Sequence, residues 1–220
     1  MELKNKKINF IGDSITEGCG TTGPDKNFCS IIEREYGAVC RNYGISGTRI
    51  SKQSEPYKEE NERDFCSRVH EMDSDADVVV VFGGTNDFGH GTALIGTMAD
   101  RTPYTFYGAL HTLFKSLIEK YTDADIVVLT PLHRSDCEDC SRGQDWNKIT
   151  DTGTLKEYVA AIREAAEYYS LPVLDLYATS GLQPNVPVIR ERYMPDSVHP
   201  NDAGHILLAK KIATFLKNML

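Results

Sequence analysis

The sequence predicts an α/β protein in which helices cover both faces of a central parallel β-sheet. Short apolar runs alternate along the 220-residue chain with longer stretches whose apolar residues recur every three or four positions. The apolar runs are continuous, as is typical of strands that are buried on both faces. Because strands that alternate with helices form parallel sheets, we expect a three-layer α/β/α arrangement of about five strands. The length suits a single domain over residues 1–220.

Five apolar runs supply the expected strands. They lie at 8–11, around 39–43, and at 78–82, 126–129 and 173–176. For these five strands we expect a flavodoxin-like order in the sheet.

Apolar residues with helical spacing indicate four helices between and after these strands. The expected helices cover residues 28–36, 106–117, 155–169 and a last stretch that begins near 201. Thr154 and Glu157 form a candidate capping box ahead of the third helix. The inward face of the last helix is expected to carry Ile206, Ala209, Ala213 and Leu216.

Composition excludes several classes of partner. The chain carries 32 acidic against 24 basic residues, a net charge of −8, so its surface repels nucleic acid and anionic membranes. No apolar run approaches the roughly 18 residues that span a bilayer. The start of the chain, MELKNKKINF, lacks the apolar core of a secretory signal. We therefore expect a cytoplasmic protein, or a secreted one if a signal was removed.

Cysteine spacing gives one candidate metal ligand set. Cys137 and Cys140 have the spacing of half a zinc site, and His133 lies nearby, but a second ligand pair of comparable spacing is missing. We therefore expect no metal, and a loop that holds two free or bridged thiols. The default for the six cysteines of a chain this long without a visible signal is the free thiol.

Polar motifs follow several of the expected strands where each strand ends. In an open parallel sheet, ligands bind beyond the carboxyl ends of the strands. Four groups that are distant in sequence should therefore meet at one edge. They are GDS at 12–14, NYGISGTRI at 42–50, FGGTNDFG at 82–89 and DSVHP at 196–200.

Together these groups contain a complete set of residues for acyl transfer. The Ser14 hydroxyl would attack an ester carbonyl, with His199 as general base and then general acid. Asp196, three residues earlier, would orient the imidazole and stabilise its cation. The backbone N–H groups of Ser14 and Gly47 and the side-chain amide of Asn86 could form an oxyanion hole.

Read together, these motifs resemble the SGNH (GDSL-type) hydrolase family of serine esterases and acylhydrolases. The four signature residues of that family match Ser14, Gly47, Asn86 and His199, in family order. The resemblance runs from position 12 to the helix after His199. It implies that Asp196 completes the triad, that the fold is flavodoxin-like and that no cofactor is needed.

Two carboxylates and a glycine flank the candidate residues. Asp13 and Asp87 stand beside Ser14 and Asn86, where local hydrogen bonding is a better expectation than acid catalysis, although both could touch substrate. Gly44 is a rival to Gly47 for the oxyanion role.

The remaining histidines are divided between loops and helices. His90 and His133 are expected in loops beyond strand ends, where they could bind substrate. His111 falls in a helical pattern, which indicates a surface or packing role, and His205 falls in the last helix.

Two long connections are candidate walls of a substrate pocket. They cover residues 88–103 and 132–151, and the second holds the only tryptophan, Trp146. Connections of this length are uncommon unless they form lids or binding loops. The alternative is a pair of surface loops with Trp146 packed on the sheet or at an oligomer contact.

The most favoured function is a serine esterase acting on a small-molecule or carbohydrate ester. The polar loops and the lack of a long apolar lid helix favour a short acyl group on a polar alcohol, such as an O-acetylated sugar. A lysophospholipase- or thioesterase-type acylhydrolase is the alternative. A non-catalytic binding module of the same fold is the other class, and the presence of all the candidate catalytic residues argues against it.

Overall fold

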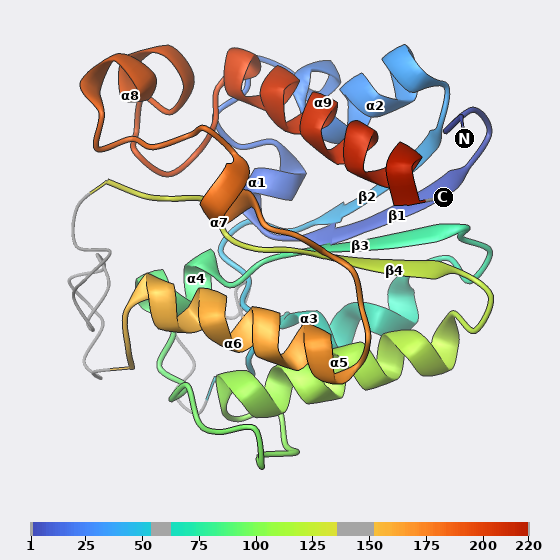
Figure 1. Cartoon of the computed structure of the whole chain (residues 1–220), viewed down its shortest axis with the longest axis vertical. Coiled ribbons are helices and arrows are strands. Elements are labelled where there is room, and N and C mark those ends of the chain that lie inside the picture. Colours follow the sequence, from blue (N-terminus) through green and yellow to red (C-terminus); the bar gives the residue numbers. More distant parts are fainter. Residues whose placement is uncertain (1, 54–62, 136–151, 220) are drawn as a thin grey trace.

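The computed structural model describes residues 2–53, 63–135 and 152–219, and these residues form a five-stranded, fully parallel sheet (Figure 1). The strand order is β2-β1-β3-β4-β5, which confirms the expected flavodoxin-like order. The strands are β1 (Lys7–Gly12), β2 (Val39–Gly44), β3 (Val78–Phe82), β4 (Asp125–Leu129) and β5 (Val173–Leu174).

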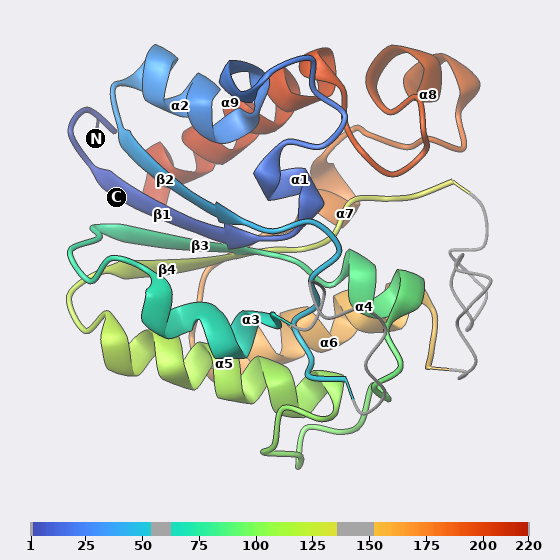
Figure 2. The same cartoon turned by 180° about the vertical axis from the view of Figure 1, so that it is seen from behind.

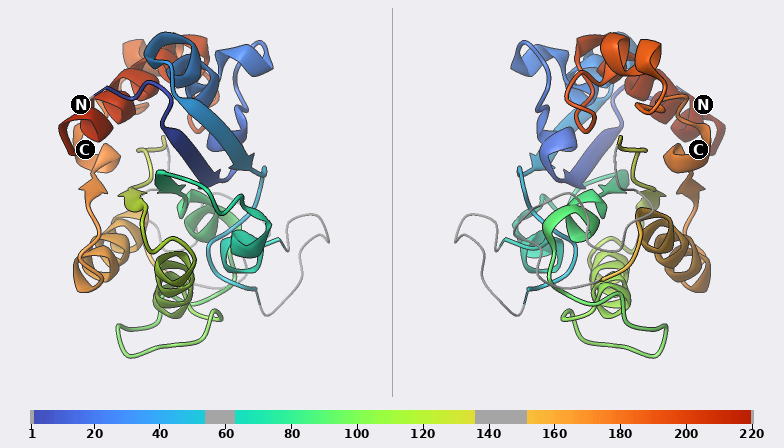
Figure 3. Two further views of the ribbon diagram at one scale, coloured as in Figure 1. Left: turned by 90° about the vertical axis from the view of Figure 1, so that its right-hand side faces the viewer. Right: turned by 90° about the vertical axis from the view of Figure 1, so that its left-hand side faces the viewer.

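Helices cover both faces of this sheet and make three layers (Figures 1 and 2). Helices α2 (Phe28–Tyr36) and α9 (Asp202–Met219) lie on one face, and α3 (Phe65–Arg68), α5 (Phe106–Lys120) and α6 (Leu155–Tyr168) lie on the other. Figure 3 shows the same layers along the strand direction.

Strand β3 shows how side-chain alternation builds two cores. Val78, Val80 and Phe82 pack in the cluster that includes α2 and α9 residues. Val79 and Val81 point to the other face, into the cluster with α5 and α6. All five are at most 3% exposed, so a continuous apolar run is the pattern that this central position requires.

The expected helices are present where the spacing predicted them, and the capping box is formed. The Thr154 hydroxyl accepts a hydrogen bond from the Glu157 N–H, while the Glu157 carboxylate accepts one from the Thr154 N–H. His111 and His205 lie in α5 and α9, the helices expected for them, and both are buried, with His111 2% exposed.

Several short helices escaped the sequence analysis because each has too few residues to show a helical period. Their residues directly follow strands or lie in loops. They are α1 (Ser14–Glu17), α3, α4 (Thr85–His90), α7 (Leu176–Thr179), α8 (Pro187–Tyr193) and the 3₁₀ turns η1 (Pro24–Lys26) and η3 (Val69–Glu71).

Four sequence expectations were wrong in detail. Strand β2 is partly exposed rather than buried on both faces, because it forms an edge of the sheet. Strand β5 is two residues long, and Leu176 of the expected strand begins α7. Ile206 is 53% exposed, because the buried face of α9 centres on Leu208, Ala209 and Ile212 instead. His90 lies at the end of helix α4 and not in a loop.

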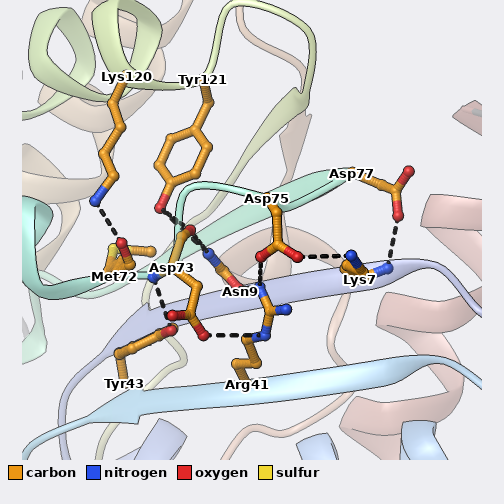
Figure 4. A network of polar contacts seen from close by, with 10 residues as sticks. All are labelled: Lys7, Asn9, Arg41, Tyr43, Met72, Asp73, Asp75, Asp77, Lys120 and Tyr121. Atoms are coloured by element: carbon orange, nitrogen blue, oxygen red, sulfur yellow. Dashed lines mark hydrogen bonds and ion pairs between the residues drawn. The ribbon is translucent and has the colours of Figure 1, made fainter.

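Polar side chains tie β1 and β2 to the segment before β3, near the amino-terminal ends of the strands (Figure 4). The buried Asn9 amide donates to the Asp73 carbonyl at 2.8 Å, and Arg41 forms ion pairs with Asp73 and Asp75 at 3.2 and 2.6 Å. Lys7 pairs with Asp75 at 2.6 Å. These ion pairs are partly exposed, so solvent screening keeps the contribution of each to stability small. They hold the sheet at the end opposite the GDS motif.

The described helices include none with both the length and the apolar character to cross a bilayer.

Candidate active site

Ser14 stands at the carboxyl end of β1, where the strand turns directly into helix α1. Asp13 caps the helix: its carboxylate accepts a hydrogen bond from the Ile15 N–H at 3.0 Å. The turn needs glycine at position 12, because a Cβ there would lie 1.9 Å from the Thr16 hydroxyl oxygen. The sequence Gly-Asp-Ser thus combines a close turn, a helix cap and a serine that is 6% exposed.

His199 reaches this serine from a loop 185 residues later in the chain. The Ser14 Oγ lies 2.9 Å from His199 Nε2, and His199 Nδ1 lies 2.7 Å from Asp196 Oδ2. The three side chains therefore form a continuous hydrogen-bonded series from hydroxyl to carboxylate. The order of groups is the one needed for proton transfer from a serine through an imidazole that a carboxylate orients.

The loop that carries Asp196 and His199 is held in a specific turn. The second carboxylate oxygen, Oδ1, accepts hydrogen bonds from the Val198 and His199 N–H groups at 2.9 and 2.7 Å. Ser197, which follows Asp196 in this turn, has a φ of +71°, a conformation that non-glycine residues adopt at a cost of about 1–2 kcal/mol. Its carbonyl accepts from the Ser135 N–H at 3.2 Å. The turn therefore orients the Asp196 carboxylate toward the His199 ring.

Asp196 stays ionised because of these contacts. Burial alone would raise the pKa of its carboxyl group, but the hydrogen bonds from the His199 ring and from two backbone N–H groups outweigh it and lower the pKa to about 2. The carboxylate is therefore available to fix the His199 tautomer across the physiological pH range.

Gly47 lies in the loop after β2 and Asn86 lies in helix α4 after β3, and these two strands flank β1. Gly47 has a φ of +74°, which favours glycine at this position. The Asn86 side-chain amide donates to the Thr48 carbonyl at 3.0 Å and so joins α4 to the loop after β2. An amide group has two hydrogens, so this bond leaves one for a ligand oxygen. The rival Gly44 has a packing role, because a Cβ there would lie 2.2 Å from the Glu17 nitrogen.

Asp13 and Asp87 are both buried, and both accept hydrogen bonds from backbone N–H groups. The Asp87 carboxylate accepts hydrogen bonds from the Ile50 and Ser51 N–H groups at 2.9 Å each. Burial raises the pKa of Asp13 to about 6 and also raises that of Asp87, although their hydrogen bonds oppose the shift. With exposures of 2% and 1%, both side chains support the backbone around the site.

The other candidate substrate residues are only partly placed. The His90 Nδ1 lies 3.1 Å from a guanidinium nitrogen of the buried Arg49, and the His133 ring packs on Tyr177 with centroids 3.9 Å apart. Trp146 lies outside the described residues, as do Cys137 and Cys140.

The two candidate wall loops differ in how far they are described. In the first, residues 88–90 belong to α4, and Leu94 is 54% exposed. The second is described only as far as residue 135 and again from 152. Within the ranges that the structure describes, no three histidine, cysteine, aspartate or glutamate side chains gather as a metal site.

The layer order and the serine–histidine–aspartate series at the carboxyl edge define an α/β/α protein of the SGNH fold class. Residues 10–207 match the GDSL-like lipase/acylhydrolase family, and the chain belongs to that family. The match includes all five candidate residues, from Ser14 to His199. The comparison with curated proteins gave no match.

Solved structures of similar proteins share this fold over nearly the whole of this chain. One crystal structure is 35% identical with a TM-score of 0.84, and 99% of each chain is covered. A protein from Lactobacillus plantarum is 28% identical with a TM-score of 0.83 and full coverage of both chains. A two-domain esterase active on acetylated mannans, crystallised with mannopentaose, is 19% identical with a TM-score of 0.62. It covers 98% of this chain and half of its own, and at that identity the likeness concerns the fold.

Proposed function

We propose that this protein is a serine ester hydrolase that cleaves small acyl esters through an acyl-enzyme. The observation that carries the proposal is the series Ser14 Oγ, His199 Nε2, His199 Nδ1, Asp196 Oδ2, with successive contacts of 2.9 and 2.7 Å across its two hydrogen bonds. Membership of an acylhydrolase family supports the same class of reaction.

The first half of the reaction makes the acyl-enzyme. Ser14 Oγ bonds to the ester carbonyl carbon while its proton moves to His199 Nε2, and the carbonyl oxygen becomes an oxyanion. The C–O bond to the alcohol then breaks, and the alcohol leaves with the proton from Nε2. Asp196 holds the proton of Nδ1 in place and stabilises the imidazolium.

The second half repeats these transfers with water. His199 Nε2 accepts a proton from water, whose oxygen bonds to the acyl carbon, and the carboxylic acid leaves as Ser14 regains its proton. In both halves the oxyanion would accept hydrogen bonds from the Ser14 and Gly47 N–H groups and from the Asn86 amide. Loss of one such donor costs about 10²–10³-fold in rate.

A short acyl group on a polar alcohol, such as an O-acetylated sugar, is the substrate class that we favour. One observation supports it: an esterase of the same fold is active on acetylated mannans. A lysophospholipase or thioesterase would instead prefer a long acyl chain.

The test compares hydrolysis of p-nitrophenyl acetate, butyrate and octanoate by the wild type and by Ser14→Ala. Turnover should fall by at least about 10³-fold in the variant, since the nucleophile is lost, with the melting temperature nearly unchanged. Ser30→Ala is the matched control, because Ser30 lies partly exposed on α2 and its hydroxyl donates to the Pro24 carbonyl, away from the candidate site. Wild-type turnover in Ser14→Ala would refute the proposal.

Two further measurements complete the test. A fluorophosphonate should label the wild type at Ser14 and leave Ser14→Ala unlabelled. Release of acetate from acetylated mannooligosaccharides, with activity that declines from acetate to octanoate, supports the sugar-ester class. A preference for octanoate or for a lysophospholipid would contradict the sugar-ester class and support a lysophospholipase- or thioesterase-type acylhydrolase.

A further inference from the structure

A buried arginine lies behind the candidate active site and is not explained by the proposed chemistry. Arg68, the last residue of α3, is 2% exposed. Within the described parts of the chain, no carboxylate lies within ion-pair distance of its guanidinium group. A buried cation without an ion pair is costly unless hydrogen bonds satisfy it, so its partners identify its role.

Among the described residues, its hydrogen-bond partners are all neutral oxygens, and three of them lie at or just beyond the carboxyl ends of β1 and β2. The guanidinium donates to the Tyr43 carbonyl at 2.7 Å, to the Gly12 carbonyl at 3.1 Å and to the Thr48 hydroxyl at 3.0 Å. The Nε–H donates to the Arg63 carbonyl at 2.9 Å, within its own segment.

Two of the three contacts lie within two residues of a proposed catalytic group, and the third lies on the strand that leads to one. Gly12 ends β1 two residues before Ser14, and Tyr43 lies in β2, which leads into the loop that carries Gly47. Thr48 follows Gly47, and its carbonyl accepts the hydrogen bond from the Asn86 amide. The rigid, planar guanidinium therefore connects the strand that leads to the nucleophile with the loop that carries Gly47 and accepts the hydrogen bond from Asn86.

The Thr48 hydroxyl links Arg68 to the turn that contains Gly47 by two hydrogen bonds. While it accepts from Arg68, it donates to the Ile45 carbonyl at 2.7 Å, which closes the turn that contains Gly47. The Ile45 N–H in turn donates to the Gly12 carbonyl at 3.1 Å. The turn that sets the direction of the Gly47 N–H is thus bonded to the end of β1 both directly and through Arg68.

The segment that carries Arg68 is itself docked on the site. The Phe65 N–H donates to the Arg49 carbonyl at 2.9 Å, and the Arg68 guanidinium lies 4.9 Å from the centre of the Phe65 ring. Position 83 has no room for a Cβ, which would lie 2.5 Å from that ring. Helix α3 therefore cannot shift without moving the strand ends around Ser14.

We propose that Arg68 is a positioning residue of the active site, which fixes the distance between Ser14 and the oxyanion donors Gly47 and Asn86. The inference rests on the proposed esterase function and adds a residue that touches neither substrate nor the reacting atoms. Burial lowers the pKa of Arg68 to about 10, so the guanidinium keeps its charge and all five N–H donors at neutral pH.

Arg68→Lys tests the guanidinium group itself. A lysine keeps the positive charge but places its N–H groups on one nitrogen, which cannot reach the three strand-end oxygens together. We expect kcat for p-nitrophenyl acetate to fall about 10- to 100-fold, because a small misplacement of catalytic groups costs up to about 10²-fold. KM should change less than about twofold. Arg34→Lys, on the exposed face of α2, is the matched control.

Thr48→Val tests the link through the Thr48 hydroxyl without removing the buried charge. Thr48 is 1% exposed, and valine keeps its shape but loses the hydroxyl. We expect kcat to fall about 10-fold, and Thr48→Ser, which restores the hydroxyl, to return it to near the wild-type value. The rate of Ser14 labelling by a fluorophosphonate should fall in proportion, since that reaction also places negative charge on an oxygen in the oxyanion hole.

The outcomes separate the two proposals. If the wild type hydrolyses esters and Thr48→Val keeps its kcat, the positioning role is overturned, whatever happens to the melting temperature. If Arg68→Lys does not fold, Thr48→Val and Thr48→Ser decide. A folded wild type that neither hydrolyses esters nor reacts with fluorophosphonate overturns the proposed function instead.

Discussion

Replacement of Asp196 by asparagine separates the two tasks of this carboxylate. Its Oδ1 accepts hydrogen bonds from the Val198 and His199 N–H groups, and its Oδ2 faces His199 Nδ1. An asparagine can keep its oxygen on the two backbone donors, but its NH₂ group then faces Nδ1. The ring must then place its proton on Nε2, where it cannot accept the proton of Ser14.

The magnitude follows from the alternative orientation of the amide. If the amide flips to accept from Nδ1, it gives up two hydrogen bonds worth about 1 kcal/mol each. A cost of about 2 kcal/mol leaves the active arrangement at about one part in 30, since 1.36 kcal/mol corresponds to a factor of ten. Loss of the negative charge beside the imidazolium adds to this, and in serine proteases the same change costs about 10⁴-fold. We expect kcat to fall between about 30-fold and 10⁴-fold.

The assay is the hydrolysis of p-nitrophenyl acetate between pH 5 and 9, together with the melting temperature. The side chain of Asp196 is 54% exposed, so water can replace part of its contact with His199. We therefore expect the fall in kcat to lie in the lower part of this range. Asp75→Asn is the matched control: it removes a carboxylate that pairs with Arg41 and Lys7 at the opposite end of the sheet (Figure 4). Turnover within a few-fold of wild type in Asp196→Asn would contradict the role of Asp196 in orienting the His199 ring.

Two further predictions concern residues that support the site. Because burial raises the pKa of Asp13 to about 6, its protonated form is favoured in the folded state, and its contribution to stability is lost as pH rises from about 4 through 6. Asp13→Asn keeps a helix cap and removes this titration, so its melting temperature should exceed that of the wild type at pH 7.5 and not at pH 4; equal differences at both values would contradict the shift. Ser197→Val should lower both melting temperature and kcat, because a β-branched residue is strained at a φ of +71°, whereas Ser197→Gly should keep kcat. If the valine variant has the melting temperature and the ester-hydrolysis rate of the wild type, the turn tolerates a β-branched residue at this φ.

The strands and long helices could be predicted because their signals are local. A strand such as β3, with all of its side chains buried, needs a continuous apolar run, and a helix such as α5 needs apolar residues every three or four positions. The edge position of β2, the two-residue length of β5 and the exposure of Ile206 depend on which neighbours each element meets. The identity of these neighbours produces no periodic pattern in the sequence of the element itself.

Within the candidate site, the chemical groups could be identified from the amino-acid order, since Ser14, Asn86, Asp196 and His199 stand in short motifs directly after strands or in a loop before a helix. Their distances, the turn at Ser197 and the link through Arg68 depend on contacts between segments that are far apart in the chain. The partners of Arg68 lie 56, 25 and 20 residues away along the chain. Its side chain is needed there because parallel strands bring their carbonyl ends to one edge, where backbone groups beyond the last ladder bond require a donor from elsewhere in the fold.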